Sequence, residues 1–175
     1  VVYFISSDIG PCFQIMSEAN DVVKGITRIT ASSNAQYLAT TALSSGGFVA
    51  GWSNVFSSTD SNVYVKIYDD LGNAITADLL VNSGNNALRS IHNLVDGGFL
   101  VIWKRTDPYI GYGLYGQKID QIGSKVGSVF SIDTQGPGDQ DLSSVIPLSD
   151  GGFLTVWNGN GETDLGYEIY SKRFD

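Results

Sequence analysis

Hydrophobic residues in this chain occur in short runs. Successive residues of an extended strand point to opposite faces, and in these runs both faces are apolar. In the clearest run, Phe99, Val101 and Trp103 lie on one side of an extended strand. Leu100 and Ile102 lie on the other side. Such a strand has to be covered on two sides, because both faces would otherwise expose apolar surface to water. The pattern therefore predicts small sheets that stack face to face.

The same pattern recurs along the chain in a fixed register. A Gly-Gly-Phe triplet occurs three times, at spacings of 51 and 54 residues, and each copy has a leucine three residues before it and a tryptophan four residues after its phenylalanine. A constant register of several landmarks indicates internal repeats. The triplets and their tryptophans are 46–48 with Trp52, 97–99 with Trp103, and 151–153 with Trp157.

Each full repeat contains four strand-like pieces, called A to D here. In the second copy they read RSIHNL, GFLVIWKR, YGLYGQKID and GSVFSIDT, with turn residues between them. We expect an all-β fold of three four-stranded repeats of about 51–54 residues, built like propeller blades, with a β-prism or a β-trefoil as alternatives. The expected repeats of this single domain are 35–86, 87–140 and a truncated third copy, 141–175.

The beginning of the chain matches a piece that the third repeat lacks. Residues 1–7 align without gaps with the D piece at 128–134, so 1–10 are predicted to be a spare D-type strand and 11–34 a non-repeat insert. The spare strand is expected to complete the last repeat, either of its own chain or of a neighbouring chain by strand addition. The predicted partner-binding residues are Val2, Tyr3, Phe4 and Ile5.

The segments DGGFLVIW, GLYGQKIDQIGSKVGSVFSIDT and SDGGFLTVW resemble the Gly-Gly-Phe...Trp tandem repeats of large secreted and surface-anchored bacterial proteins. The resemblance covers about residues 35–175. It implies an extracellular or cell-surface setting and a role in adhesion or surface structure. The motif is specific for a class of repeat and does not indicate an activity.

These observations lead to a functional expectation with one alternative. We expect an extracellular structural or adhesive subunit without enzyme activity, which assembles into a filament or oligomer of identical chains by donating its N-terminal strand. The alternative is a monomeric lectin-like module that its own N-terminal strand closes and that binds glycans. The tyrosines expected to contact a glycan or a partner are Tyr109, Tyr112 and Tyr167.

Composition excludes several partners. The net charge of -8, with only 10 lysines and arginines, argues against binding the phosphate backbone of nucleic acid. The longest apolar runs are far shorter than the roughly 20 residues of a membrane-spanning helix. Cys12 is the single cysteine, which rules out an internal disulfide and a cysteine-rich metal site.

Candidate chemistry is sparse. His92 is the only histidine and lies among apolar residues, so a structural role is expected. A Thr-Asp pair recurs between pieces B and C, and its aspartates are weak calcium candidates because Ca²⁺ prefers oxygen ligands. An Asx turn is the favoured explanation, because no copy has the dense series of Asp, Asn and Gly residues of a strong calcium loop. No cofactor is expected beyond that cation. The three aspartates are Asp60, Asp107 and Asp164.

Overall fold

The computed structural model describes residues 2–7, 10–107, 111–133, 140–160 and 166–175; for residues 2–7, 107, 142, 143, 160 and 167 it describes the backbone alone. The described residues form β-strands and connecting turns, with no helix. The strands are β1 (Val2–Ser7), β2 (Gly10–Met16), β3 (Val22–Arg28), β4 (Ala35–Ala42), β5 (Phe48–Ser57), β6 (Asp60–Tyr68), β7 (Leu79–Asn82), β8 (Asn86–Asn93), β9 (Phe99–Asp107), β10 (Gly111–Ile119), β11 (Lys125–Ser131), β12 (Gln140–Pro147), β13 (Phe153–Asn160) and β14 (Tyr167–Phe174).

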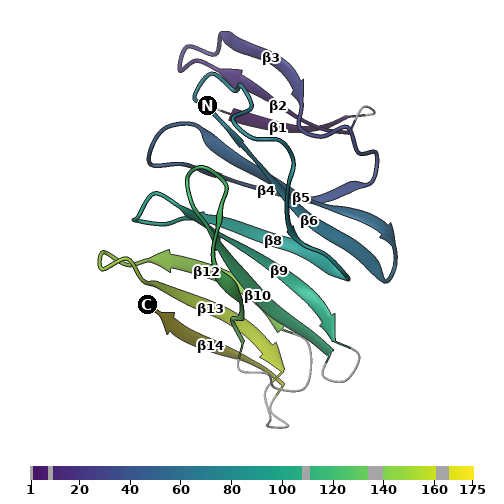
Figure 1. Ribbon diagram of the computed structural model, residues 1–175, viewed down its shortest axis with the longest axis vertical. Helices are drawn as coiled ribbons and strands as arrows, with labels where there is room; N and C mark the ends of the chain where they lie inside the picture. The colour runs from purple at the N-terminus through teal and green to yellow at the C-terminus, as the bar shows by residue number, and fades with distance from the viewer. Residues whose placement is uncertain (1, 8–9, 108–110, 134–139, 161–165) are drawn as a thin grey trace.

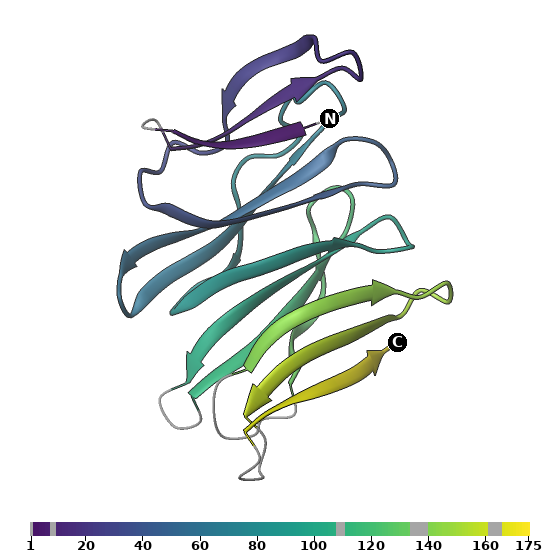
Figure 2. The ribbon, with the colours of Figure 1, turned by 180° about the vertical axis from the view of Figure 1, so that it is seen from behind.

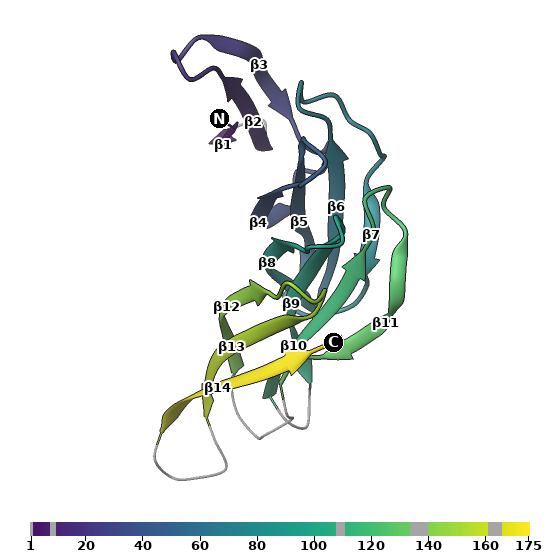
Figure 3. The same ribbon diagram turned by 90° about the vertical axis from the view of Figure 1, so that its left-hand side faces the viewer.

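The strands form four antiparallel sheets, which we name sheets A to D in chain order. Sheet A is β1-β2-β3, sheet B is β4-β5-β6-β7, sheet C is β8-β9-β10-β11 and sheet D is β12-β13-β14. The sheets are stacked one after another, with the two chain ends at opposite ends of the stack (Figures 1 and 2). The stack is curved, with β4, β8 and β12 on its inner side and β7 and β11 on its outer side (Figure 3).

The glycine pairs of the repeat form the turn between the first two strands of sheets B, C and D. In sheet C, Leu94 donates its backbone N–H to the carbonyl of Gly98, and Gly97 donates to the carbonyl of Leu94. Gly97 has a φ of +88°, a conformation that favours glycine. A side chain at Gly98 would collide with the backbone carbonyl of Ile119 on the neighbouring strand. The turn geometry therefore explains why both glycines are needed.

The N-terminal sheet differs from the sequence-based expectation. The turn after β2 has the same two backbone hydrogen bonds as the turns after β6 and β10, and a residue with positive φ stands at the same place in each: Asn20, Gly72 and Gly123. The pairing of β2 with β3 also matches that of β10 with β11, for example Cys12 with Arg28 and Tyr115 with Ser131. The three strands of sheet A thus correspond to the second, third and fourth strand-like pieces of a repeat, which are pieces B, C and D of the sequence analysis.

Three expectations about the N-terminus are therefore wrong. Val2–Ser7 is a B-type strand and not a D-type strand, because it pairs with β2 over six residues, from Val2 with Ile15 to Ser7 with Gly10. Residues 11–34 are not an insert, since they supply β2 and β3. Closure of sheet D by the chain's own first strand is also wrong, because β1 lies at the other end of the stack. Donation of this strand to a neighbouring chain stays a prediction.

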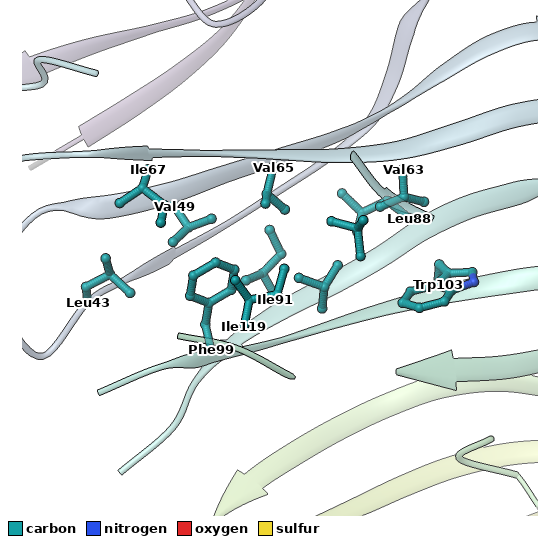
Figure 4. Packing of buried hydrophobic residues seen from close by; sticks show 12 residues of the cluster. Leu43, Val49, Val63, Val65, Ile67, Leu88, Ile91, Phe99, Trp103 and Ile119 are labelled. Carbon is teal, nitrogen blue, oxygen red and sulfur yellow. The ribbon is translucent and has the colours of Figure 1, made fainter. Parts of the chain in front are cut away.

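Apolar side chains fill the three spaces between successive sheets, as the two-sided pattern predicts. Phe99, Val101 and Trp103 pack against sheet B, in a cluster with Val49, Val63 and Leu88 (Figure 4). Leu100 and Ile102 pack on the opposite side, against Phe153 and Trp157 of sheet D. All five side chains of this β9 run are fully buried. The prediction that β9 is covered on both faces is confirmed.

The three repeat tryptophans are core residues. Trp52 and Trp103 are fully buried and Trp157 is 1% exposed. Trp52 stacks on Tyr64 and Trp157 stacks on Tyr170, with ring centroids 5.9 and 5.8 Å apart. This confirms packing as their role and leaves the exposed tyrosines as the aromatic candidates for ligand contact.

Candidate functional site

A polar cleft opens between sheets B and C, at the side of the stack where β5 turns into β6. Its volume is about 370 Å³. Both inner strands contribute to it, together with the β5–β6 hairpin and the adjoining ends of β9 and β10. The lining residues are Tyr37, Val55, Ser57, Ser58, Ser61, Asn85, Ala87, Arg89, Lys104, Thr106 and Tyr112.

Buried hydrogen bonds hold the two sides of the cleft together. Ser61 donates its hydroxyl to the carbonyl of Asn86 at 2.6 Å, and the backbone N–H of Asn86 donates to the same hydroxyl at 3.0 Å. Bonds between buried partners are costly to break, so they fix the spacing of sheets B and C at this point.

Tyr37 enters the cleft from an irregular part of β4. The pairing of β4 with β5 shifts between Gln36 and Ala39, and Tyr37 has a φ of +53°. Aromatic residues rarely adopt this left-handed conformation, and such outliers concentrate at functional sites. The side chain is 49% exposed, so the irregularity presents an aromatic ring to solvent inside a polar cleft.

Tyr112 contributes a second aromatic ring from sheet C. It lies near the start of β10, is 40% exposed and pairs across the sheet with Thr106. The ammonium group of Lys104 lies 4.3 Å from the centroid of its ring. This cation–π contact restrains both side chains and places a positive charge beside the ring.

Arg89 extends the polar lining along the inner side of the stack. Its guanidinium Nε lies 3.5 Å from Oδ1 of Asp141, which belongs to β12 in the next sheet. Arg89 stands at the shift in pairing between β8 and β9, between Leu88 and Ser90. A charged pair therefore links the lining of this cleft to sheet D.

A second hollow of about 390 Å³ lies on sheet C, where the β8–β9 and β10–β11 turns adjoin. Its lining includes Leu94, Ile119, Ile122 and Val126 beside Asp96 and Lys118. Although it is slightly larger, it offers one face of a single sheet. The polar cleft is the stronger candidate because aromatic, hydroxyl, amide and cationic groups converge there from two sheets.

His92 lies on β8 outside the cleft lining. It is half-buried, and its Nε2 has no hydrogen-bond partner among the described residues. Burial lowers the pKa of this imidazole below its ordinary value, which favours the neutral form. The expected structural role of His92 is consistent with this position.

A separate polar cluster joins sheets A and B. Lys66 Nζ lies 3.0 Å from Oδ1 of Asp78, and the hydroxyl of Thr30 donates to Oδ2 of the same carboxylate at 3.0 Å. The hydroxyl of Tyr68 donates to the carbonyl of Ile29 at 3.3 Å. Burial, followed by the charge of Asp78, raises the pKa of Tyr68. The polar groups of this cluster bind one another, as in a contact that stabilises the fold.

Of the sequence-predicted site residues, Tyr112 is the one that the structure places in the cleft. Tyr109 and Asp164 lie outside the described residues, and the side chains of Tyr167 and Asp107 lie outside them as well. Asp60 is exposed at the start of β6.

Among the described residues, no three histidine, cysteine, aspartate or glutamate side chains gather as a metal site, and calcium binding stays a prediction. Within the same ranges, no helix has the length and apolar character required to cross a membrane.

Sequence reasoning missed Tyr37, Arg89 and Lys104. The signal for Tyr37 was available: the aligned repeats have leucine at this position, Leu88 and Leu142, and only the first has tyrosine. A polar aromatic residue at a core position of a repeat marks a place where the repeat has changed its role.

Comparisons with known proteins support the architecture and bear on the functional expectation. No family model matches the chain, and no curated protein matches it either. Among solved structures, it is similar to an endo-arabinase from Bacteroides thetaiotaomicron VPI-5482, with a TM-score of 0.58 and 12% identity over 98% of this chain and 69% of that one. At this identity the likeness shows the fold alone. It still overturns the expectation that the chain is not an enzyme, because an enzyme has this arrangement of sheets.

Proposed function

We propose that this chain is a propeller-type array of β-blades that binds a carbohydrate in the polar cleft between sheets B and C. One observation carries the proposal: Tyr37 and Tyr112 bring partly exposed aromatic rings into one polar cleft from two different sheets. Sugars present apolar C–H faces and hydroxyl groups together. A site that combines aromatic rings with hydrogen-bonding groups suits both features.

The remaining lining supports the same class of ligand. Ser57, Ser58 and Thr106 supply hydroxyl groups, Asn85 supplies an amide, and Lys104 and Arg89 supply cationic donors. These groups lie on a floor that buried hydrogen bonds hold in place. A site formed in advance binds with less loss of conformational entropy than one that must become ordered.

The fold similarity supports a choice of first ligand. One solved structure with a similar fold is named an endo-arabinase. We therefore propose arabino-oligosaccharides as the first probes, followed by a broad glycan array. The expected setting of the protein is extracellular, where polysaccharides are accessible.

Isothermal titration calorimetry with these oligosaccharides tests the proposal. We expect measurable binding by the wild-type chain and a loss of about tenfold or more in affinity for Tyr112→Ala, which corresponds to about 1.4 kcal/mol. Phe56→Ala is the matched control, because Phe56 is 53% exposed but does not line the cleft. Analysis of the same mixtures for shortened oligosaccharides reports cleavage.

Two results count against the proposal. One is an absence of binding to every glycan of the array. The other is an equal loss of affinity in Tyr112→Ala and Phe56→Ala, which points to a general effect of removing an exposed ring.

A further inference from the structure

Two cationic side chains distinguish the lining of the polar cleft. Lys104 and Arg89 both belong to it, and within the described ranges no aspartate or glutamate does. The chain as a whole has a net charge of -8, with 18 acidic and 10 basic residues. The cleft therefore offers an anionic ligand a local attraction that the net charge of the chain does not provide.

Both cations lie on neighbouring strands of sheet C. Lys104 of β9 pairs with Ala87 of β8, and Arg89 follows Ala87 by two residues along β8. Adjacent strands of a sheet are about 4.8 Å apart, so two long side chains at such close positions are within range of one anionic group. The register of the sheet therefore brings the two charges to the same part of the cleft.

The repeat itself does not require a charge at either position. The register of sheets B and D and the aligned repeats place neutral residues there. They are Ser53 and Asn158 at the position of Lys104, and Leu38 and Ser143 at the position of Arg89. Since neutral residues serve in the two other sheets of the same design, the cations of sheet C need an explanation other than the packing of the repeat.

The charge of Lys104 is not neutralised by a described carboxylate. Its side chain is half-buried, its ammonium group lies 4.3 Å from the centroid of the Tyr112 ring, and it forms no ion pair with the described residues. A cation–π contact restrains the side chain but leaves its positive charge in place. The ammonium group therefore retains N–H donors for a ligand.

The charge of Arg89 is only partly compensated. Its Nε lies 3.5 Å from Oδ1 of Asp141, and this contact involves one of the five N–H donors of the guanidinium group. The two side chains are 31% and 53% exposed, so solvent weakens their attraction. Asp60 pairs with Ser57 on the β5–β6 hairpin but does not belong to the lining. The described groups thus leave the cleft positive.

We propose that the ligand of this cleft is an acidic glycan, whose anionic group binds between Lys104 and Arg89. The inference rests on the proposed carbohydrate site, in which Tyr37 and Tyr112 contact the sugar rings. Charge-assisted hydrogen bonds to an anion are about twice as strong as those between neutral groups, so they distinguish an acidic sugar from a neutral one. The carboxylate of a uronic acid and a sulfate ester both supply this chemistry.

Calorimetry with matched pairs of oligosaccharides tests this inference. One pair is an oligogalacturonate and its methyl ester, and the other is a sulfated galactan oligosaccharide and its desulfated form. The wild-type chain is expected to bind the anionic member of at least one pair about tenfold or more tightly than the neutral member. Added salt should reduce this preference, because it screens the charges. The pair that shows the preference identifies the anionic group.

The outcomes separate this inference from the proposed function. Equal affinity for the two members of each pair overturns the preference for acidic glycans and leaves carbohydrate binding in place. An absence of binding to every glycan overturns both.

Three charge-removing variants locate the preference. Lys104→Gln and Arg89→Gln should each lower the ratio of the affinities for the anionic and neutral members, and the double variant should bring this ratio to about one. Lys125→Gln is the matched control, because Lys125 is exposed at the start of β11 and does not line the cleft. Circular dichroism confirms that each variant is folded. An equal fall in the ratio for Lys104→Gln, Arg89→Gln and Lys125→Gln would indicate an effect of net charge and would overturn the assignment to this cleft.

Discussion

Tyr37 and Leu88 hold the same position in two successive inner strands, yet Leu88 is 2% exposed and Tyr37 is 49% exposed. Leu88 packs in the core between sheets B and C, whereas Tyr37 lies in the polar cleft at the edge of that core. The position that is buried in the core in sheet C is therefore exposed to solvent in sheet B. The exposed tyrosine at this position marks the candidate site.

Replacing Tyr37 with the leucine of the other repeats should reduce ligand binding without unfolding the protein. The ring is half-exposed, so its removal costs little packing, and we expect the free energy of unfolding to change by less than about 1 kcal/mol. The affinity for the bound glycan should fall by about tenfold. Calorimetry and urea denaturation of Tyr37→Leu measure the two effects. A large loss of stability would show that Tyr37 has a structural role instead.

Two equivalent leucines should differ in their contribution to stability. Leu100 is fully buried between sheets C and D, and Leu100→Ala is expected to cost about 2–5 kcal/mol. Leu154 occupies the same position on β13 but is only partly buried, so Leu154→Ala should cost less than about 1 kcal/mol. Chemical denaturation of the two variants provides the comparison. Equal losses would mean that the side chain of Leu154 is packed as closely as that of Leu100.

Gly51 should not tolerate the residue found at its position in sheet C, which is Ile102. A Cβ at Gly51 would lie 2.6 Å from Cδ1 of Ile91 and 3.2 Å from the carbonyl oxygen of Tyr64. Overpacking of this kind costs about 1–3 kcal/mol, so Gly51→Ile should lower the midpoint of urea denaturation. Gly25→Ala is the control, because no atom lies within 4 Å of a Cβ at that glycine, and its stability should be unchanged or slightly higher.

Stability should fall in mild acid because of His92. Burial lowers the pKa of His92 in the folded state, so below about pH 6.5 the unfolded chain takes up a proton more readily than the folded one. The stabilisation is therefore complete above that pH and is lost as the pH falls through the lower pKa of the folded state. His92 is the only histidine, so His92→Gln should flatten the pH dependence of unfolding between pH 7 and pH 5. An unchanged profile would contradict this assignment.

The lowered pKa values of Asp69 and Asp150 act at a different pH. Hydrogen bonds from Asn73 and from Gly152, respectively, are the main causes. Stability from these carboxylates is present above the ordinary aspartate pKa and is lost as the pH falls below it, so this loss begins at a lower pH than the loss due to His92. Both groups are exposed, and the effect is expected to be small.

Much of the fold could be predicted because its signals are local. Glycines at 97 and 98 are required by a turn and by a nearby carbonyl, and the two-sided run from Phe99 to Trp103 is required by stacking. The type of the first strand could not be predicted, because Ile5 stands where the other B-type strands have tryptophan. In the turn after β2, Asn20 stands where the equivalent turns have glycine, so the glycine that marks this turn in the other repeats is absent from the sequence. Asparagine can also adopt the positive φ that the turn requires.

The candidate site was only partly accessible from sequence. Tyr112 was expected to contact a ligand because it lies in a tyrosine-rich loop region. Its neighbours Tyr37, Arg89 and Lys104 come from different strands, and only the pairing of those strands and the stacking of sheets B and C bring them together. Such a site depends on contacts between repeats, which a repeat pattern does not encode.

The location of ligand binding is tested most directly by following backbone amide signals in a two-dimensional ¹H–¹⁵N NMR titration with the glycan selected from the array. We predict that the largest shifts occur at Tyr37, Asn85, Arg89, Thr106 and Tyr112, which line the cleft between sheets B and C. Shifts confined to the hollow around Leu94 and Ile122, or spread evenly over the chain, would contradict carbohydrate binding in this cleft.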